Sequence, residues 1–286
     1  MRFHSNMATV EDWETGERYV CKLRGRFKIQ GIRPIVGDIV EYIPDSFESG
    51  RIENILHRKS ELKKPRIANV DQVVLVTTLK QPKIPLKMID RFLILAEKVF
   101  LPTVIVFNKI DLLDSNEFEE LEQIEKIYSK YYRTLRTSAK KEIGLKELKD
   151  ILKNKISTLA GLSGVGKSSL LNCISPGVKL RVGELSEKLE RGKHTTTHAE
   201  LLRLEFGGYV ADTPGFANLD ISEIKPDELK KLFPEFLEVD HCTFPDCVHI
   251  DEPGCTVKEA IGTSIAESRY ESYVDFYREL LENHSR

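Results

Sequence analysis

The chain has 286 residues, of which 41% are hydrophobic and 31% charged, and its formal net charge is −2. This length exceeds one average domain, so we expect two or three compact units, each able to bury its own core. The composition argues against a disordered chain, and the small net charge gives no general affinity for polyanions.

Charge is distributed unevenly along the chain. Lys and Arg outnumber Asp and Glu by 12 to 6 over residues 18–66 (net +6) and by 23 to 19 over residues 67–215 (net +4). Over residues 216–286 the balance reverses to 7 against 16 (net −9). The two ends of the chain therefore cannot meet a polyanion in the same way.

The N-terminal stretch MRFHSNMATV has no apolar core for a signal peptide. The apolar runs are also shorter than the roughly 18 residues that a membrane span needs. We therefore expect a cytoplasmic protein with no membrane association, in which the five cysteines stay reduced. Cys21 and Cys173 stand alone, and we expect both to be small buried hydrophobic residues.

Three regions follow one another along the chain. In residues 18–66, short runs such as RYVCKLRG, RFKIQG and DIVEYIP are rich in β-branched and aromatic residues and predict strands of a small all-β barrel. Over 67–215, apolar strands alternate with helices, which predicts a parallel sheet covered by helices on both faces. Residues 216–286 predict helices in KPDELKKLFPEFLE and RYESYVDFYRELLENH, with a Cys-rich loop between them.

A phosphate-binding loop is the strongest motif. Residues 161–168 read GLSGVGKS, which matches G-x-x-x-x-G-K-[ST], and the motif lies between a predicted strand and a predicted helix, as it requires. Glycines let the backbone N–H groups wrap around phosphate oxygens, and the following helix adds its positive end. We expect Lys167 to reach the β- and γ-phosphates and Ser168 to bind Mg²⁺. The expected contact residues are Gly161, Leu162, Ser163, Gly164, Val165, Gly166, Lys167, Ser168 and Ser169.

The segment NKID, residues 108–111, points to guanine as the base. It ends an apolar strand, so its side chains should emerge at the carboxyl edge of the sheet. Asp111 would accept hydrogen bonds from N1–H and the N2 amino group of guanine, donors that adenine lacks. Adenine would be excluded because it would leave the buried carboxylate unpaired. Asn108 would support the loop and the base, Lys109 would pack along the base, and Ile110 completes the segment. In TSAK, which ends the next strand, Ser138 and Ala139 lie where a backbone N–H would contact O6.

The remaining nucleotide elements lie further along the chain. In VADTPGF, Asp212 can hold the Mg²⁺ shell and the Gly215 N–H can sense the γ-phosphate. In RGKHTTTHAE, one hydroxyl among Thr195, Thr196 and Thr197 should complete the Mg²⁺ shell. The base-reading elements thus precede the phosphate loop, which is the usual GTPase order cut and rejoined. Because all these loops share one edge of a sheet, such a circular permutation preserves the site.

The permuted order, the GLSGVGKSSL loop, the N-terminal PIVGDIV segment and the C-terminal Cys/His cluster resemble one family over nearly the whole chain. The sequence is similar to the circularly permuted, ribosome small-subunit-dependent GTPases (RsgA). The resemblance implies an OB-fold domain, a permuted GTPase domain and a zinc-binding domain, with boundaries at 1–66, 67–215 and 216–286. It also implies GTP hydrolysis to GDP and phosphate, stimulated by the small ribosomal subunit during its late maturation.

The Cys/His cluster has the spacing Cys242-x4-Cys247-x-His249-x5-Cys255. Three thiolates and one imidazole in a short loop suit a closed tetrahedral zinc site, which would stabilise a unit too small to be held by its own core. His241 also adjoins Cys242, but the resemblance favours His249 as the ligand. We expect one structural Zn²⁺ per chain.

The group that activates the attacking water is less apparent. Ras-like enzymes carry a Gln after the Gly of this motif, whereas this chain has Phe216, which cannot bond to water, so turnover by the chain alone should be slow. His194, in GKHTTT, or a group from the ribosome would then assist Lys167 and Asp212. Gly164 stands where potassium-dependent relatives carry Asn, so a potassium ligand is not implied.

The basic N-terminal region is the expected RNA contact, because OB-folds bind RNA through charged grooves and aromatic platforms. The candidates are Arg24, Arg26, Phe27, Lys28 and Arg33. Binding to rRNA and timing of release by GTP hydrolysis follow from the resemblance, with a monomer expected off the ribosome. The alternative is a non-enzymatic RNA-binding module gated by nucleotide, which Phe216 would also fit.

Overall fold

The computed structural model describes residues 3–4, 7–13, 15–29, 31–46, 48–63, 66–178, 200–212 and 219–284. The chain divides into two compact units. The first comprises Met1–Gln72, Lys146–Leu159 and Ser168–Gly215, and the second comprises Val73–Leu145, Ala160–Lys167 and Phe216–Arg286. The predicted boundaries at 1–66, 67–215 and 216–286 stay a prediction.

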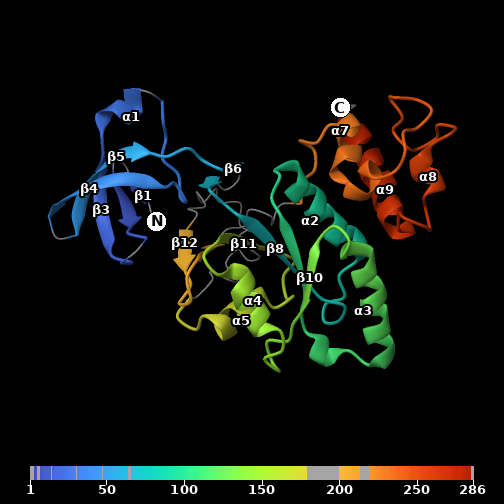
Figure 1. Cartoon of the computed structure of the whole chain (residues 1–286), viewed down its shortest axis with the longest axis horizontal. Helices are drawn as coiled ribbons and strands as arrows, with labels where there is room; N and C mark the ends of the chain where they lie inside the picture. Colours follow the sequence, from blue (N-terminus) through green and yellow to red (C-terminus); the bar gives the residue numbers. More distant parts are fainter. Residues whose placement is uncertain are drawn as a thin grey trace, which may run out of the picture. The chain divides into compact units, whose positions relative to one another are not determined.

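The first unit begins with an all-β sheet in the order β1-β2-β3-β5-β4, in which the β3/β5 pair is parallel and the other pairs are antiparallel (Figure 1). Strand β2 alternates exposed and buried residues, so that Ala8 and Val10 point into the barrel core with Cys21 and Ile52. The bounds are β1 Phe3–His4, β2 Met7–Glu11, β3 Arg18–Leu23, β4 Val40–Ser46 and β5 Ser49–Ile55, followed by the β6 Glu61–Lys63 and β7 Arg66–Ala68 ribbon.

One predicted strand is a helix. The run RFKIQG lies largely in helix α1, Gly25–Ile29, whose Phe27 is 5% exposed and joins the barrel core. A short run with one buried aromatic residue carries too little periodicity to separate helix from strand.

Six strands form the central sheet, in the order β10-β9-β8-β11-β13-β12. Within the first unit, β11 pairs with β13 in parallel, but β12 pairs with β13 antiparallel, so the sheet is mixed and the prediction of a parallel sheet was wrong at this edge. Cys173 in α5 is exposed, which corrects the expected burial, whereas Cys21 is buried. The bounds are β11 Ile156–Ala160, β12 Glu200–Arg203, β13 Tyr209–Asp212, α4 Leu145–Leu152 and α5 Lys167–Ile174.

Strands β8 (Gln72–Thr77), β9 (Thr103–Phe107) and β10 (Arg133–Arg136), which apart from Gln72 belong to the second unit, pair in parallel. Every residue of β8 and β9 is buried, which explains their continuous apolar sequence. Because parallel strands end at the same edge, the segments that follow them converge there. The helices are α2, Leu86–Lys98, and α3, Ser115–Tyr128, whose Asp114 forms a capping box with Glu117.

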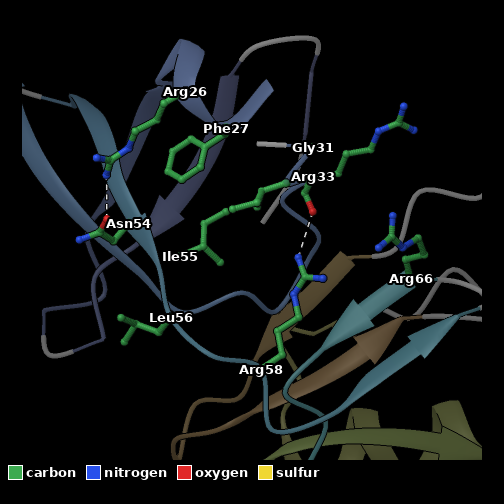
Figure 2. A pocket seen from close by; sticks show the side chains of 10 residues that line it. Arg26, Phe27, Gly31, Arg33, Asn54, Ile55, Leu56, Arg58 and Arg66 are labelled. Carbon is green, nitrogen blue, oxygen red and sulfur yellow. Dashed lines mark hydrogen bonds between the residues drawn. The ribbon is translucent and has the colours of Figure 1, made fainter. Parts of the chain in front are cut away.

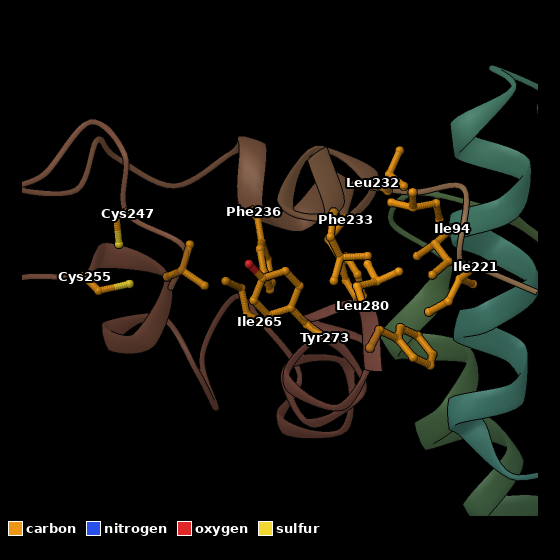
Figure 3. Close-up of a cluster of buried hydrophobic side chains, with 14 residues drawn as sticks. Ile94, Ile221, Leu232, Phe233, Phe236, Cys247, Cys255, Ile265, Tyr273 and Leu280 are labelled. Atoms are coloured by element: carbon orange, nitrogen blue, oxygen red, sulfur yellow. The ribbon is translucent and has the colours of Figure 1, made fainter. Parts of the chain in front are cut away.

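The C-terminal part of the second unit is helical, as predicted, although Pro234 divides KPDELKKLFPEFLE into short turns. Figure 3 shows its apolar core, which continues to Ile94 of α2 and packs against α9 through Tyr273 and Leu280. No described helix is long and apolar enough to cross a membrane. The bounds are α7 Pro226–Leu229, η3 Lys230–Leu232, η4 Pro234–Leu237, α8 Thr256–Glu259 and α9 Glu267–His284.

Candidate nucleotide and metal sites

Residues 108–111, which we call the base loop, follow β9 in the second unit. Asn108 is 4% exposed, and its Nδ2 donates to the carbonyl of Val165 at 2.9 Å. Its Oδ1 accepts from the Thr137 hydroxyl at 3.1 Å. Asn108 therefore holds the base loop, the end of β10 and the phosphate loop together.

Lys109 supports the same junction. It adopts a left-handed backbone conformation with φ of 61°, just before the 3-10 turn η1, Ile110–Leu112. Its Nζ donates to the carbonyls of Gly164 at 2.7 Å and Gln81 at 2.5 Å. The side chain thus lies against residues 161–168, which we call the phosphate loop, and against the segment that follows β8.

The carboxylate of Asp111 is oriented by the end of the next strand. The buried Ser138 hydroxyl donates to Asp111 Oδ1 at 2.5 Å and accepts from the backbone N–H of Lys141 at 3.0 Å. The structure therefore brings Asp111 and Ser138 together, with Ala139 next in the chain. A half-buried carboxylate fixed in this way is suited to accept paired N–H donors such as those on guanine.

Two glycines of the phosphate loop have little room for a side chain. Gly161 has φ of +129°, and a Cβ there would lie 2.1 Å from the Val76 carbonyl oxygen. Gly166 has φ of +96°, and a Cβ there would lie 2.3 Å from Asn108 Nδ2. Both positions require glycine on grounds of backbone conformation and of space.

Lys167 begins helix α5, and its Nζ donates to the carbonyls of Gly161 and Leu162, both at 2.8 Å. Partial burial lowers the pKa of this amine from its ordinary value. Ser168 and Ser169 follow on the same helix. Within the loop, Val165 is fully buried, whereas Ser163 and Gly164 are exposed.

Some predicted residues lie outside the described part of the chain. These are His194, Thr195, Thr196, Thr197 and Gly215, and also Phe216. Asp212 is the last residue of β13, but its side chain is not described. Their contributions to the site stay predictions.

The four predicted metal ligands lie together, and their ligand atoms are all within 4.8 Å of one another. Nδ1 of His249 lies 3.5 Å from the sulfurs of Cys242 and Cys247 and 3.4 Å from that of Cys255. The sulfurs of Cys242 and Cys255 are 3.9 Å apart. These residues therefore could bind a metal ion.

The three sulfur–nitrogen separations and the Cys242–Cys255 separation fit a tetrahedral site. With metal–sulfur and metal–nitrogen bonds of about 2.3 and 2.05 Å, tetrahedral geometry places S and N about 3.6 Å apart and two S atoms about 3.8 Å apart. Burial lowers the pKa of His249, which favours the neutral imidazole that a metal needs, and raises that of Cys247 to about 12. A metal would therefore displace thiol protons on binding.

Three of the predicted RNA residues, Arg26, Phe27 and Arg33, help to line a cavity of about 510 Å³ on the barrel (Figure 2). Arg26 bonds to the Glu53 carbonyl and to Asn54, and Arg24 pairs with Glu53 at 2.8 Å. The ring of Phe27 belongs to the core, which leaves it little surface for stacking. The structure describes Lys28 only as part of α1, without its side chain.

Sequence reasoning assigned no role to two residues of the nucleotide site. The Thr137 hydroxyl donates to Asn108 and orients it, and the Gln81 carbonyl accepts a hydrogen bond from Lys109. Thr137 is recognisable only because it precedes Ser138 at a strand end. Gln81 acts through its main chain, which leaves no side-chain signal.

The phosphate loop, the guanine-type base loop before it in the chain and the open α/β sheet define a circularly permuted P-loop GTPase. Two family models match the sequence, RsgA GTPase over residues 53–222 and RsgA N-terminal domain over residues 7–52. The chain belongs to the RsgA GTPase family.

Relatives and solved structures agree with this membership. The "Small ribosomal subunit biogenesis GTPase RsgA" of Thermotoga petrophila is 61% identical over 98% of this chain and 95% of its own length, and that of Thermotoga maritima is 60% identical over the same shares. The crystal structure of YjeQ from Thermotoga maritima has a TM-score of 0.88 and 56% identity, covering 98% of this chain and 96% of its own. The structure of YloQ, a circularly permuted GTPase, has a TM-score of 0.81 and 35% identity, covering 97% and 92%.

Proposed function

We propose that this GTPase acts in late maturation of the small ribosomal subunit, binds its rRNA and uses GTP hydrolysis to time its release. The observation that carries the proposal is the 61% identity, over 98% of the chain, to a protein named a small ribosomal subunit biogenesis GTPase. The intact junction between Asn108 and Val165 supports a working nucleotide site. Such a protein would work in the cytoplasm, and we propose that it is a monomer off the ribosome.

In the nucleotide site, Asp111 would accept from N1–H and N2 of guanine, and a backbone N–H at Ser138 or Ala139 would donate to O6. Lys167 would turn from its loop carbonyls to the β- and γ-phosphates, because phosphate oxygens are the stronger acceptors. Mg²⁺ would be held by Ser168, by Asp212 and by one Thr of residues 195–197. The metal would neutralise charge on the transferred phosphoryl group.

Water activation would depend on a group that is brought in, since Phe216 replaces the usual Gln. We propose that His194 or a group of the ribosomal subunit orients the water, and that Gly215 senses the γ-phosphate. Exchange of His194 for Ala should then lower subunit-stimulated turnover at least about tenfold while GTP affinity stays within about twofold. Unchanged turnover would assign the role to the ribosome.

For the Cys/His cluster we propose one structural Zn²⁺ per chain. The supporting observation is the agreement of the sulfur and nitrogen separations with tetrahedral coordination. Four protein ligands fill the coordination shell, so the ion would stabilise the loop without taking part in hydrolysis.

For RNA we propose the cavity on the barrel as the contact. Among the described residues, the guanidinium groups of Arg26, Arg58 and Arg66 already bond to protein partners, whereas that of Arg33 has none (Figure 2). Arg33 is exposed and is therefore the strongest phosphate-binding candidate of the predicted set. Arg24, Arg26 and Lys28 would add positive potential, and Phe27 would form part of the wall.

Cosedimentation tests the proposal. The purified chain, loaded with a non-hydrolysable GTP analogue or with GDP, is centrifuged with small or large ribosomal subunits. We expect binding to small subunits at least about tenfold tighter with the analogue than with GDP, since only a state-dependent affinity can time release. Equal affinity in both states, or binding to large subunits alone, would refute it.

A further inference from the structure

The main chain of the metal loop, residues 242–255, is held by side chains from other elements. Four consecutive main-chain carbonyls, those of residues 247–250, each accept a hydrogen bond from a side chain outside the metal loop. The donors are Lys230 to Cys247 at 2.9 Å, Tyr273 to Val248 at 2.6 Å, Tyr270 to His249 at 2.8 Å and Lys258 to Ile250 at 3.2 Å.

This support falls where the backbone has an uncommon conformation. His249 has φ of 62°, in the left-handed region that few residues other than Gly adopt and in which Asn, Asp and His are over-represented. The N–H groups of Val248 and Ile250 donate to the Glu252 carboxylate at 2.7 and 3.0 Å. An uncommon conformation persists only where its surroundings hold it, so these bonds fix the backbone from which the His249 imidazole extends.

The two tyrosines lie beside a residue that faces the GTPase helix α2. Arg269 is buried, and its Nη1 lies 2.8 Å from Asp90 of α2. Its Nε lies 2.5 Å from Glu235 of η4, while Asp90 also accepts from the Tyr128 hydroxyl of α3 at 2.8 Å. Within five residues, α9 therefore binds the metal loop on one side and the helix α2 on the other.

The apolar core connects the same two places. Figure 3 shows buried side chains running from Cys247 and Cys255 through Phe236 and Tyr273 to Ile94 on α2. The contacts among these groups all lie within the second compact unit. A displacement of the metal loop would disturb Tyr273, and through it the packing that holds α9 on α2.

We propose that residues 269–273, which we call the α9 strut, position the metal loop against helix α2, so that metal binding and the attachment of the C-terminal region to α2 stabilise each other. The inference rests on the proposed zinc site. Tyr270 and Tyr273 are positioning residues for His249. The ion pair between Arg269 and Asp90 couples the position of α9 to helix α2. Linkage requires that the coupling act equally in both directions.

The first test measures zinc affinity of the full chain by competition with a chromophoric chelator. Tyr273→Phe and Tyr270→Phe each remove one hydroxyl, and we expect zinc to bind about three- to tenfold more weakly, the effect of one hydrogen bond. Tyr277→Phe is the matched control, because Tyr277 stacks on Tyr273 on the same helix and has no hydrogen bond to the described metal loop. It should change affinity less than twofold.

The outcomes separate the inference from the zinc proposal. If the wild-type chain binds one zinc and both tyrosine variants bind it as tightly as the control, the positioning role is wrong while the zinc site stands. If the wild-type chain binds no zinc, both proposals fail.

The second test follows amide hydrogen exchange of the full chain with zinc and after its removal by a chelator. We expect exchange in α2, residues 86–98, to accelerate at least about fivefold without zinc, because its partner helix loses support. Helix α4, residues 145–152, serves as the internal reference and should not change.

By reciprocity, Asp90→Asn should weaken zinc binding at least threefold. Acceleration confined to the metal loop, with unchanged zinc affinity in Asp90→Asn, would overturn the coupling.

Discussion

Asn108 donates from its side-chain amide to the main-chain carbonyl of Val165, 57 residues later in the chain, at 2.9 Å. This bond joins the base loop to the phosphate loop although the two motifs stand in permuted order. The cut and rejoined chain retains the site because the contact depends on the shared sheet edge and is indifferent to which loop comes first.

Base recognition by Asp111 predicts a change of specificity. Asp111→Asn replaces an acceptor pair with an amide, and two charge-assisted hydrogen bonds of about 1.5–3 kcal/mol each are lost. GTP affinity should fall at least about 100-fold, while xanthosine triphosphate, which carries oxygen in place of the N2 amino group, should bind better than to the wild type. Titration with fluorescent nucleotides measures both. Ser138→Ala removes only the hydroxyl that orients Asp111, and it should lower GTP affinity by about tenfold or less. An Asp111→Asn variant that keeps its GTP affinity would contradict the assignment.

The two glycines at 164 and 166 form a matched pair. Both have positive φ, but a Cβ at Gly166 would lie 2.3 Å from Asn108 Nδ2, whereas at Gly164 the nearest atom is 3.5 Å away. Gly164→Ala should weaken GTP binding only through the strain of a left-handed non-glycine residue, which is about 1–2 kcal/mol. Gly166→Ala adds a clash with the Asn108 junction, so its GTP affinity should fall further, by at least another tenfold. Equal losses would show that the junction does not matter for binding.

The buried Arg269 predicts a large stability effect. Arg269→Met leaves Asp90 and Glu235 buried without a cation, and breaking such a cluster costs about 3–5 kcal/mol in the free energy of unfolding. Lys87→Met breaks an exposed pair with Asp275 of the same helix α9 and should cost less than about 1 kcal/mol. Urea denaturation monitored by circular dichroism compares the two variants. Similar small losses in both would mean that the cluster is better solvated than its burial indicates.

If Arg33 binds an RNA phosphate, RNA binding should depend less on salt concentration when Arg33 is removed. Each phosphate contact contributes about 0.7 to the slope of log K against log salt for single strands. Arg33→Ala should therefore reduce the slope for an rRNA fragment by about that amount, with a uniform loss of affinity. Arg133→Ala, at an exposed position on β10, is the control and should leave the slope unchanged. A loss of slope in the control but not in Arg33→Ala would move the contact away from the barrel.

Much of the fold and site was predictable because the signals are local. The apolar runs of β8 and β9 and the phosphate-loop spacing each fix their own conformation. The antiparallel direction of β12 was not predictable, since strand direction depends on partners and leaves no local pattern. The support of the metal loop by Tyr270 and Tyr273 was missed for a related reason, because it passes through main-chain carbonyls that lie 21 and 25 residues away in the chain.

Multiple-turnover GTP hydrolysis tests most directly whether the small ribosomal subunit activates this GTPase. The purified chain is assayed alone, with small subunits and with large subunits as the control. We predict slow turnover alone, stimulation of at least about tenfold by small subunits and none by large subunits, because the chain carries Phe216 in place of the usual water-orienting Gln. Tight GTP binding without stimulation by small subunits would contradict the account.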